Sequence, residues 1–453
     1  RHCATFAMSP SPSPLLDCAE VKPARWRTPV AWVPHVLLVH AVIAYGVDCR
    51  YPRHWANPAA ALAVALGAMC RIQVPPPLGV AVDALSSMVV RIAPLVAPLS
   101  AAAGAWSSYQ VWRFTLGAGG IGCGAIASLV CKGPLLWATA SLLHASTAWW
   151  SRGRVEATKT RFCKQIDQSH VEAARQARPA VPIAARIHPC FFPYRSFGIQ
   201  RIAVPGGATM DIWPVPGNPR CQGPVFFFVH GGAWKGGSSR ANPTTLLLHR
   251  LSMRGWHVYA VNYRKQRWPQ QLSDCRVALH YVQAKHGKEC KLVLSGSSAG
   301  GHLAALLASD ESCSPLAGVV LSYPAVDPAD EMRQCIPFPC GGPPTMKWFF
   351  ELVVLRGNRA LWPQAIPIAH LTAKFPPCLI VHGEIDGLVP VVSSCGFMAA
   401  LSAARSCQRD MLVQIPGAKH CFEHGGGPLV ATVNDGIVAW LRDVEGDLDN
   451  CCM

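Results

Sequence analysis

A serine with a glycine on either side stands between an apolar strand-like run and an apolar helix-like run of this chain. Gly296 and Gly300 flank Ser298 in the order Gly-Ser-Ser-Ala-Gly. A hydroxyl can attack a carbonyl carbon only where it stands clear of the backbone, and small neighbours permit the sharp strand-to-helix turn that exposes it. Ser298 is therefore the candidate nucleophile. The alternative is a loop of serine and glycine that only caps a helix.

A second glycine motif follows another apolar run. Residues 225–229 have the continuous apolar character of a buried parallel strand, and His-Gly-Gly-Ala-Trp follows at 230–234. Glycine lets the backbone N–H groups of Gly231 and Gly232 approach a developing negative charge, and the N–H of Ala299 would point the same way from its helix start. We therefore predict an oxyanion hole formed by these three residues. A plain glycine turn is the alternative.

A serine nucleophile requires a base, and the base requires an acid that orients it. Asp386 follows the apolar run 378–381, and His420 follows the run 411–415 through a short Pro-Gly loop. Both side chains would lie beyond the carboxyl ends of strands. We predict that Asp386 and His420 are the acid and the base that serve Ser298.

The sequence offers other candidates for the acid and for the base. Glu384 competes with Asp386, but Asp386 lies farther into the loop, where a carboxylate can turn toward an imidazole. The chain has 17 histidines. We interpret three of them as structural, because His302 lies in the helix behind the serine, His382 abuts a strand and His424 lies in a glycine-rich segment.

The elements that must hold these residues alternate along the second part of the chain. Helical stretches separate most of the later strand-like runs, as right-handed crossovers in a mostly parallel sheet require, so we predict an α/β domain. The segment 324–367 lacks a strand pattern, and its apolar helix candidate at 346–355 is expected to form a lid or acyl pocket over Ser298, or else a surface helix packed on the core. The predicted strands are 199–203, 210–213, 225–229, 256–261, 292–295, 318–322, 378–381 and 411–415.

Together these segments resemble the hormone-sensitive-lipase-like branch of the α/β-hydrolases, and within it the carboxylesterases with a short HGGAW motif. The resemblance covers about residues 199–441 and implies an α/β-hydrolase fold with the chain order Ser298, Asp386, His420. It implies ester hydrolysis through an acyl-enzyme, with no metal and no organic cofactor. The motifs that carry it are 230–234, 262–264, 268–269 with Asp274, 296–303, 382–390 and 417–422.

The resemblance leaves the substrate open. Related enzymes include membrane-associated esterases, prenylcysteine methylesterases, kynurenine formamidases and feruloyl-esterase-like proteins. We expect a small-molecule ester, and a lipophilic one because of the apolar N-terminal region. The alternatives are an amidase such as an aryl formamidase, and a non-catalytic ligand receptor on a hydrolase fold. One departure from these relatives, a shorter turn at 285–290, affects no catalytic role.

The N-terminal third of the 453-residue chain is unlike a soluble enzyme domain. Its long apolar runs predict a helical membrane region over residues 28–151 with between about two and four spans. A buried helical domain is the alternative. We expect residues 1–27 to be disordered and residues 446–453 to form a tail. The apolar runs are 28–47, 56–70, 78–103, 114–131 and 133–151.

Basic residues concentrate in and beside this region. The first 201 residues hold 20 Lys and Arg against 7 Asp and Glu, whereas the rest hold 21 against 18. We interpret 152–195 as a basic juxtamembrane linker whose charge keeps the catalytic domain, 196–445, on the cytosolic side of a membrane. No nucleic-acid motif accompanies the charge, and the 20 cysteines show no paired metal-ligand spacing. We expect membrane lipid and an ester as partners, no nucleic acid and no metal, with the oligomeric state left open.

Overall fold

The computed structural model describes residues 152–182, 185, 192–217, 223–240, 244–287, 289–328, 350–386, 388–425 and 427–445. The predicted disordered segment, the predicted membrane region and the predicted C-terminal tail lie outside these residues, as does the middle of the predicted lid. Within the described ranges, no helix combines the length and the apolar character that crossing a bilayer requires.

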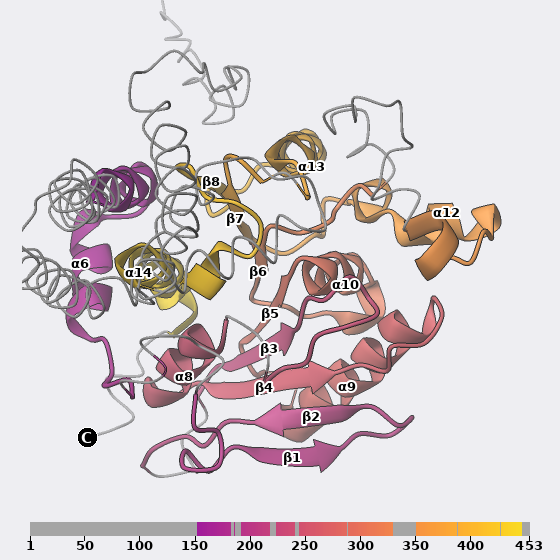
Figure 1. Cartoon of the computed structure of the whole chain (residues 1–453), viewed down its shortest axis with the longest axis horizontal. Coiled ribbons are helices and arrows are strands. Elements are labelled where there is room, and N and C mark those ends of the chain that lie inside the picture. The colour runs from indigo at the N-terminus through magenta and orange to yellow at the C-terminus, as the bar shows by residue number, and fades with distance from the viewer. Residues whose placement is uncertain are drawn as a thin grey trace, which may run out of the picture.

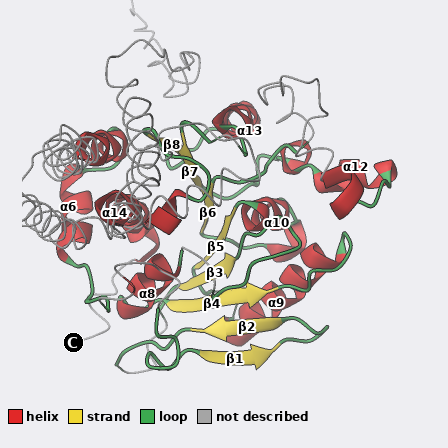
Figure 2. Ribbon diagram, viewed as in Figure 1, coloured by secondary structure: helices red, strands yellow, loops and turns green. Residues whose placement is uncertain are grey.

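A mostly parallel sheet runs through the centre of the described part (Figures 1 and 2), in the order β1-β2-β4-β3-β5-β6-β7-β8. Strand β2 pairs antiparallel with both β1 and β4, and all later neighbours pair in parallel. The predicted α/β class is confirmed, and the strand ends agree with those predicted to within two residues. The bounds are β1 Gln200–Ala203, β2 Thr209–Ile212, β3 Val225–Val229, β4 His257–Asn262, β5 Leu292–Ser297, β6 Gly318–Ser322, β7 Cys378–Gly383 and β8 Met411–Ile415.

Helices cover both faces of this sheet, and successive residues of β3 point into the two layers in turn. Phe227 packs in one apolar cluster with α9, α10 and α13, whereas Phe226 and Phe228 pack in another with α6, α8 and α14 (Figure 1). Burial on both faces explains why β3 is apolar throughout. The helices are α6 Gln168–Gln176, α8 Thr245–Met253, α9 Gln270–His286, α10 Ala299–Ala308, α12 Trp362–Ala365, α13 Val391–Ala404 and α14 Gly427–Glu445.

The segment predicted as a linker, 152–195, is in part a packed component of the domain. Residues 152–163 are helical, and the ring of Phe162 is fully buried. Gly436 of α14 makes room for that ring, because a Cβ at this position would lie 2.4 Å from it. Helix α6 also packs along α14 and buries Val171 there. The folded domain therefore begins earlier than the predicted boundary at residue 196.

The predicted helix at 346–355 lies partly outside the described residues. Its described part, Phe350–Val354, forms a short π-helical turn that buries Phe350 and Val354. The ring centroid of Phe350 lies 4.7 Å from that of Trp234 and 6.4 Å from that of Trp268. This turn thus packs on the loop that follows β3.

Candidate active site

Ser298 occupies a strained turn between β5 and α10. Its backbone has φ 54° and ψ −122°, a conformation that costs free energy in a residue with a Cβ and marks functional turns. A Cβ on Gly296 would lie 2.3 Å from the carbonyl oxygen of Gly300, and one on Gly300 would lie 2.2 Å from that of Val229. Both flanking positions therefore require glycine, and the turn holds the Ser298 hydroxyl at the carboxyl end of the sheet.

The structure brings the three residues of the predicted catalytic set together. His420 follows β8, and its Nε2 lies 2.9 Å from the Ser298 hydroxyl. Its Nδ1 lies 2.7 Å from Oδ2 of Asp386, which follows β7. Oδ1 of Asp386 accepts the backbone N–H groups of Leu388 and Val389, each at 2.9 Å. A continuous hydrogen-bonded chain therefore runs from the serine hydroxyl through the imidazole to a fixed carboxylate.

Burial acts on the pKa values of Asp386 and His420 in the direction opposite to their mutual charge and hydrogen bond. Burial acts to raise the pKa of Asp386, but the charge of His420 and hydrogen bonds from His382 and His420 hold it well below its usual range. Burial acts to lower the pKa of His420, but the charge of Asp386 raises it well above its usual value. Asp386 thus stabilises a positive charge on the imidazole, as a base that receives the serine proton requires.

Glu384, the rival acid in the sequence, faces away from His420. Its Oε1 pairs with Nη2 of Arg161 at 2.5 Å, and its Oε2 accepts the backbone N–H of Gly417 at 3.1 Å. Arg154 donates from Nε to the carbonyl oxygen of Pro416 at 2.6 Å. The helix at 152–163 therefore holds the loops that carry Asp386 and His420, and Glu384 serves that contact.

Two of the histidines interpreted as structural have buried partners. Nδ1 of His302 accepts the indole N–H of Trp234 at 3.1 Å, so its Nε2 donates to the carbonyl oxygen of Ala365 at 2.8 Å. His382 contacts the Ser394 hydroxyl at 2.8 Å through Nδ1, and its Nε2 lies 3.3 Å from the Asp386 carboxylate. The side chain of His424 lies outside the described part.

The His-Gly-Gly-Ala-Trp loop passes directly over the serine. A Cβ on Gly231 would lie 3.2 Å from Cβ of Ser298. Gly232 has φ 124° and accepts the N–H of Gly236 at 2.7 Å through its carbonyl oxygen, so the loop closes on itself. Trp234 anchors the loop with a buried ring. The loop therefore lies beside the start of α10, where Ala299 stands.

Sequence reasoning missed two buried side chains beside the imidazole. Tyr323 follows β6, and its ring centroid lies 4.7 Å from that of His420 in an edge-on arrangement. Glu423 lies three residues after His420 and is 5% exposed. Burial raises its pKa to about 7, while Tyr323 and His420 act in the opposite direction. In the sequence, only the short separation between Glu423 and His420 could have indicated Glu423. No such signal exists for Tyr323, because the strand order brings it beside His420.

Metal coordination has no candidate within these residues. In the described ranges, no group of three or more His, Cys, Asp or Glu side chains is arranged to hold a metal ion.

Comparison with known proteins bears on the same segment. Residues 226–424 match the model of a family described as having the alpha/beta hydrolase fold. Esterase LipC of Mycobacterium tuberculosis is 30% identical over 262 residues, which are 52% of this chain and 62% of LipC. Esterase LipQ of the same organism is 31% identical over 279 residues, which are 54% of this chain and 62% of LipQ. This chain thus spans about three fifths of the length of these curated relatives.

Among solved structures, carboxyl esterase 2 of Tuber melanosporum is similar with a TM-score of 0.46 and 22% identity, covering 56% of this chain and 88% of that one. The residues that match the family include the turn at Ser298, the glycine loop after β3 and the loops that carry Asp386 and His420. With the mostly parallel sheet and its helices on both faces, this match identifies the fold of the domain as the α/β-hydrolase fold.

Proposed function

We propose that this chain is a serine carboxylesterase that cleaves carboxylic esters through an acyl-enzyme intermediate. One observation carries the proposal, namely the hydrogen-bonded chain from Ser298 through His420 to Asp386 beneath the glycine loop. Relatives named as esterases support an ester rather than an amide as the substrate. The match to them covers only part of their length, so the activity of the whole protein rests on this geometry.

The proposed reaction proceeds in two steps. His420 takes the proton of Ser298 through Nε2 while the serine oxygen attacks the ester carbonyl, and Asp386 holds the tautomer in which Nδ1 carries hydrogen. Backbone N–H groups of Gly231, Gly232 and Ala299 stabilise the negative charge on the tetrahedral intermediate. The protonated imidazole then gives its proton to the leaving alcohol. Water, activated by His420 in the same way, releases the acid and restores Ser298.

The test uses p-nitrophenyl esters of increasing acyl length on the full chain in non-ionic detergent. We expect Ser298→Ala to lower kcat by about 10⁴-fold or more with unchanged circular dichroism, because the nucleophile is lost while the fold remains. Ser309→Ala, at the far end of α10, is the matched control and should keep full activity. Comparable turnover by Ser298→Ala and wild type would contradict the proposal.

The proposal extends to the membrane. The apolar runs within 28–151 support attachment of the chain to a bilayer, the basic residues that follow them support a cytosolic catalytic domain, and a site held there favours a lipophilic ester. We expect alkaline carbonate to leave the full chain in the membrane pellet, and activity to rise with acyl length up to medium chains. Release of the chain into the supernatant would contradict the attachment, and a strict preference for acetate would contradict the lipophilic substrate.

A further inference from the structure

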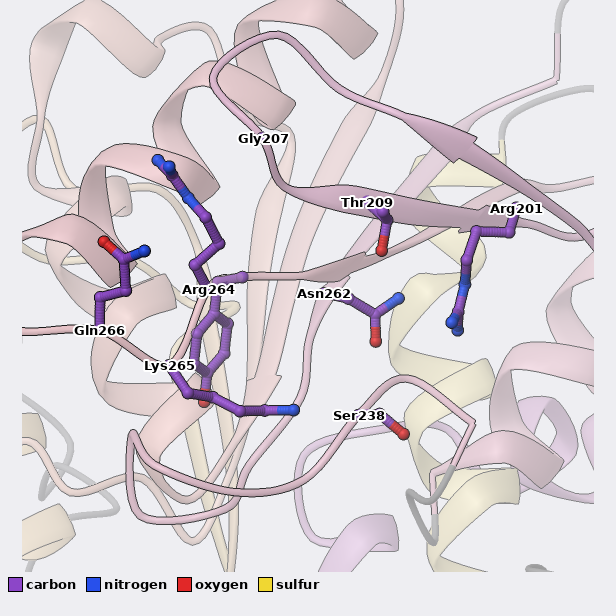
Figure 3. A pocket seen from close by; sticks show the side chains of 9 residues that line it. Arg201, Gly207, Thr209, Ser238, Asn262, Arg264, Lys265 and Gln266 are labelled. Atoms are coloured by element: carbon purple, nitrogen blue, oxygen red, sulfur yellow. The ribbon is translucent and has the colours of Figure 1, made fainter.

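An open pocket of about 460 Å³ lies on the domain apart from the triad. The hairpin of β1 and β2, the carboxyl end of β4 and the loop around Ser238 form its walls (Figure 3). Ser298, Asp386 and His420 are not among the residues that line it. The lining residues are Arg201, Gly207, Thr209, Ser238, Asn262, Tyr263, Arg264, Lys265 and Gln266.

The lining of this pocket is positively charged. Three of the nine lining residues are cationic and none is acidic. Arg201 binds Asp211 through Nε and Nη2, but Arg240 binds the same carboxylate with both of its corresponding nitrogens. One buried carboxylate therefore balances two guanidinium groups and leaves one positive charge at this wall. Arg264 is balanced by its own partner, Asp274.

Lys265 adds a second positive charge. Among the described residues no carboxylate pairs with its ammonium group, and the side chain is exposed. In Figure 3 it extends toward the space between Asn262 and Ser238, while Arg264 and Gln266 point to the other side. Arg201, which shares one carboxylate with Arg240, and Lys265 thus face the same space from opposite sides.

Asn262, which lines that space, carries a buried donor. Oδ1 of Asn262 accepts the backbone N–H of Ser239 at 2.8 Å, which fixes the orientation of the amide. Its Nδ2 is buried and has no hydrogen-bond partner in the described part of the chain. Burial of a donor without an acceptor is unfavourable. Thr209, the partner of Asn262 in the register between β2 and β4, adds a hydroxyl to the same lining.

We propose that this pocket binds an anionic oxygen group, the phosphate or carboxylate of a small molecule. Lys265 and Arg201 supply the charge, and Nδ2 of Asn262 supplies a directed hydrogen bond to one ligand oxygen. The hydroxyl of Thr209 can donate to a second oxygen. A neutral ligand would leave the charge of Lys265 without a counterpart.

The pocket also adjoins the glycine loop over Ser298. The ring of Tyr263 stacks on that of His230 with centroids 4.3 Å apart, and Lys235 donates to the carbonyl oxygen of Gln266 at 2.7 Å. The bond from Ser239 to Asn262 is a third link between the two segments. An anion held by Asn262 and Lys265 therefore stabilises the segment that supports the loop.

The test is calorimetric titration of inorganic phosphate, phenyl phosphate and acetate into the full chain in non-ionic detergent. These anions separate the inorganic ion, an organic phosphate and a carboxylate as occupants. Lys265→Gln should weaken binding about tenfold or more, as loss of a charge-assisted hydrogen bond predicts. Asn262→Asp keeps the acceptor for Ser239, replaces the free donor by a negative charge and should abolish binding. Lys291→Gln removes an exposed charge elsewhere and should bind as wild type does.

Saturable binding of any of the three anions that is weakened in Lys265→Gln and lost in Asn262→Asp supports the site, and the tightest anion identifies the occupant class. Absence of saturable binding by wild type, or equal weakening in Lys291→Gln, overturns it. Ser298→Ala should bind the anion like wild type, so the site and the proposed esterase activity fail or succeed separately.

Discussion

The loop after β7 brings the buried carboxyl group of Asp386 to the imidazole of His420, and the turn after β8 brings that of Glu423 to the same ring. The pKa of Asp386 is lowered, whereas that of Glu423 is raised. The charge of His420 and hydrogen bonds from His382 and His420 hold the pKa of Asp386 well below its usual range despite burial, and two backbone N–H groups fix the carboxylate. Oε2 of Glu423 has no hydrogen-bond partner among the described residues, and burial raises the pKa of this carboxyl to about 7.

The difference shows that burial alone does not decide what a carboxyl group can do. The charge and hydrogen bonds of His420 and His382 stabilise the charged form of Asp386, whereas at Glu423 burial outweighs the hydrogen bonds and leaves the neutral form favoured. One group can therefore orient His420 and balance its charge, and the other can only fill space or titrate near neutrality. The predictions below test this division, starting with the largest effect.

Removing the charge of Asp386 should have the largest effect. Asp386→Asn keeps the shape but favours the wrong imidazole tautomer, so we expect kcat to fall by about 10⁴-fold. The matched change Glu423→Gln mimics the neutral carboxyl and should leave kcat at pH 6 within about threefold of wild type. Steady-state hydrolysis of one p-nitrophenyl ester measures both. Equal losses in the two variants would break the comparison.

The ionisation of Glu423 should make the folding stability depend on pH. The folded pKa of Glu423 is raised from 4.5 to about 7, so the unfolded chain ionises first and stability falls as pH rises through this window. Each pKa unit is worth about 1.4 kcal/mol, so the loss by pH 8 is on the order of 3 kcal/mol. Glu423→Gln should therefore unfold at higher temperature than wild type at pH 8, but not at pH 4.5. Differential scanning at both pH values checks this, and a pH-independent difference would contradict it.

The pH dependence of catalysis should shift by a smaller amount. An ionised Glu423 above pH 7 favours the charged imidazole and so raises the pKa of His420. In Glu423→Gln this contribution is absent, and the acid limb of kcat/KM should move to lower pH by less than about one unit. A full pH profile of both proteins measures the shift, and a displacement toward higher pH would be inconsistent with it.

The contact from the N-terminal helix should matter least. Arg161→Met removes the partner of Glu384 while the loops keep their backbone hydrogen bonds, so kcat should fall by about threefold with little change in KM. Arg175→Met removes an exposed ion pair with Glu172 and serves as the control. A loss of 100-fold or more in Arg161→Met would show that this contact, and not the carboxyl environments, dominates the site.

The sequence predicted the sheet and the glycine turns because their signals are local. The apolar run of β3 and the flanking positions Gly296 and Gly300 reflect burial and close contact within a few residues. Strand ends were less accurate, because β5 and β7 extend for as long as their neighbours continue to pair with them. Local pattern thus predicted which elements exist better than where they end.

The roles that sequence missed depend on contacts between distant segments. Tyr323 reaches His420 only because β6 and β8 lie on either side of β7. Arg154 and Arg161 fit a juxtamembrane charge pattern, yet the buried ring of Phe162 places them against the loops after β7 and β8. Neither the strand order nor this docking can be derived from composition or spacing.

The most direct test of the account is covalent labelling of the full chain with a fluorophosphonate, followed by mapping of the modified residue by mass spectrometry. We expect a single adduct on Ser298 in wild type, slower labelling in Asp386→Asn, unaltered labelling in Glu423→Gln at pH 6, and none in Ser298→Ala. Labelling that persists in Ser298→Ala, or a folded wild type that remains unlabelled, would contradict it.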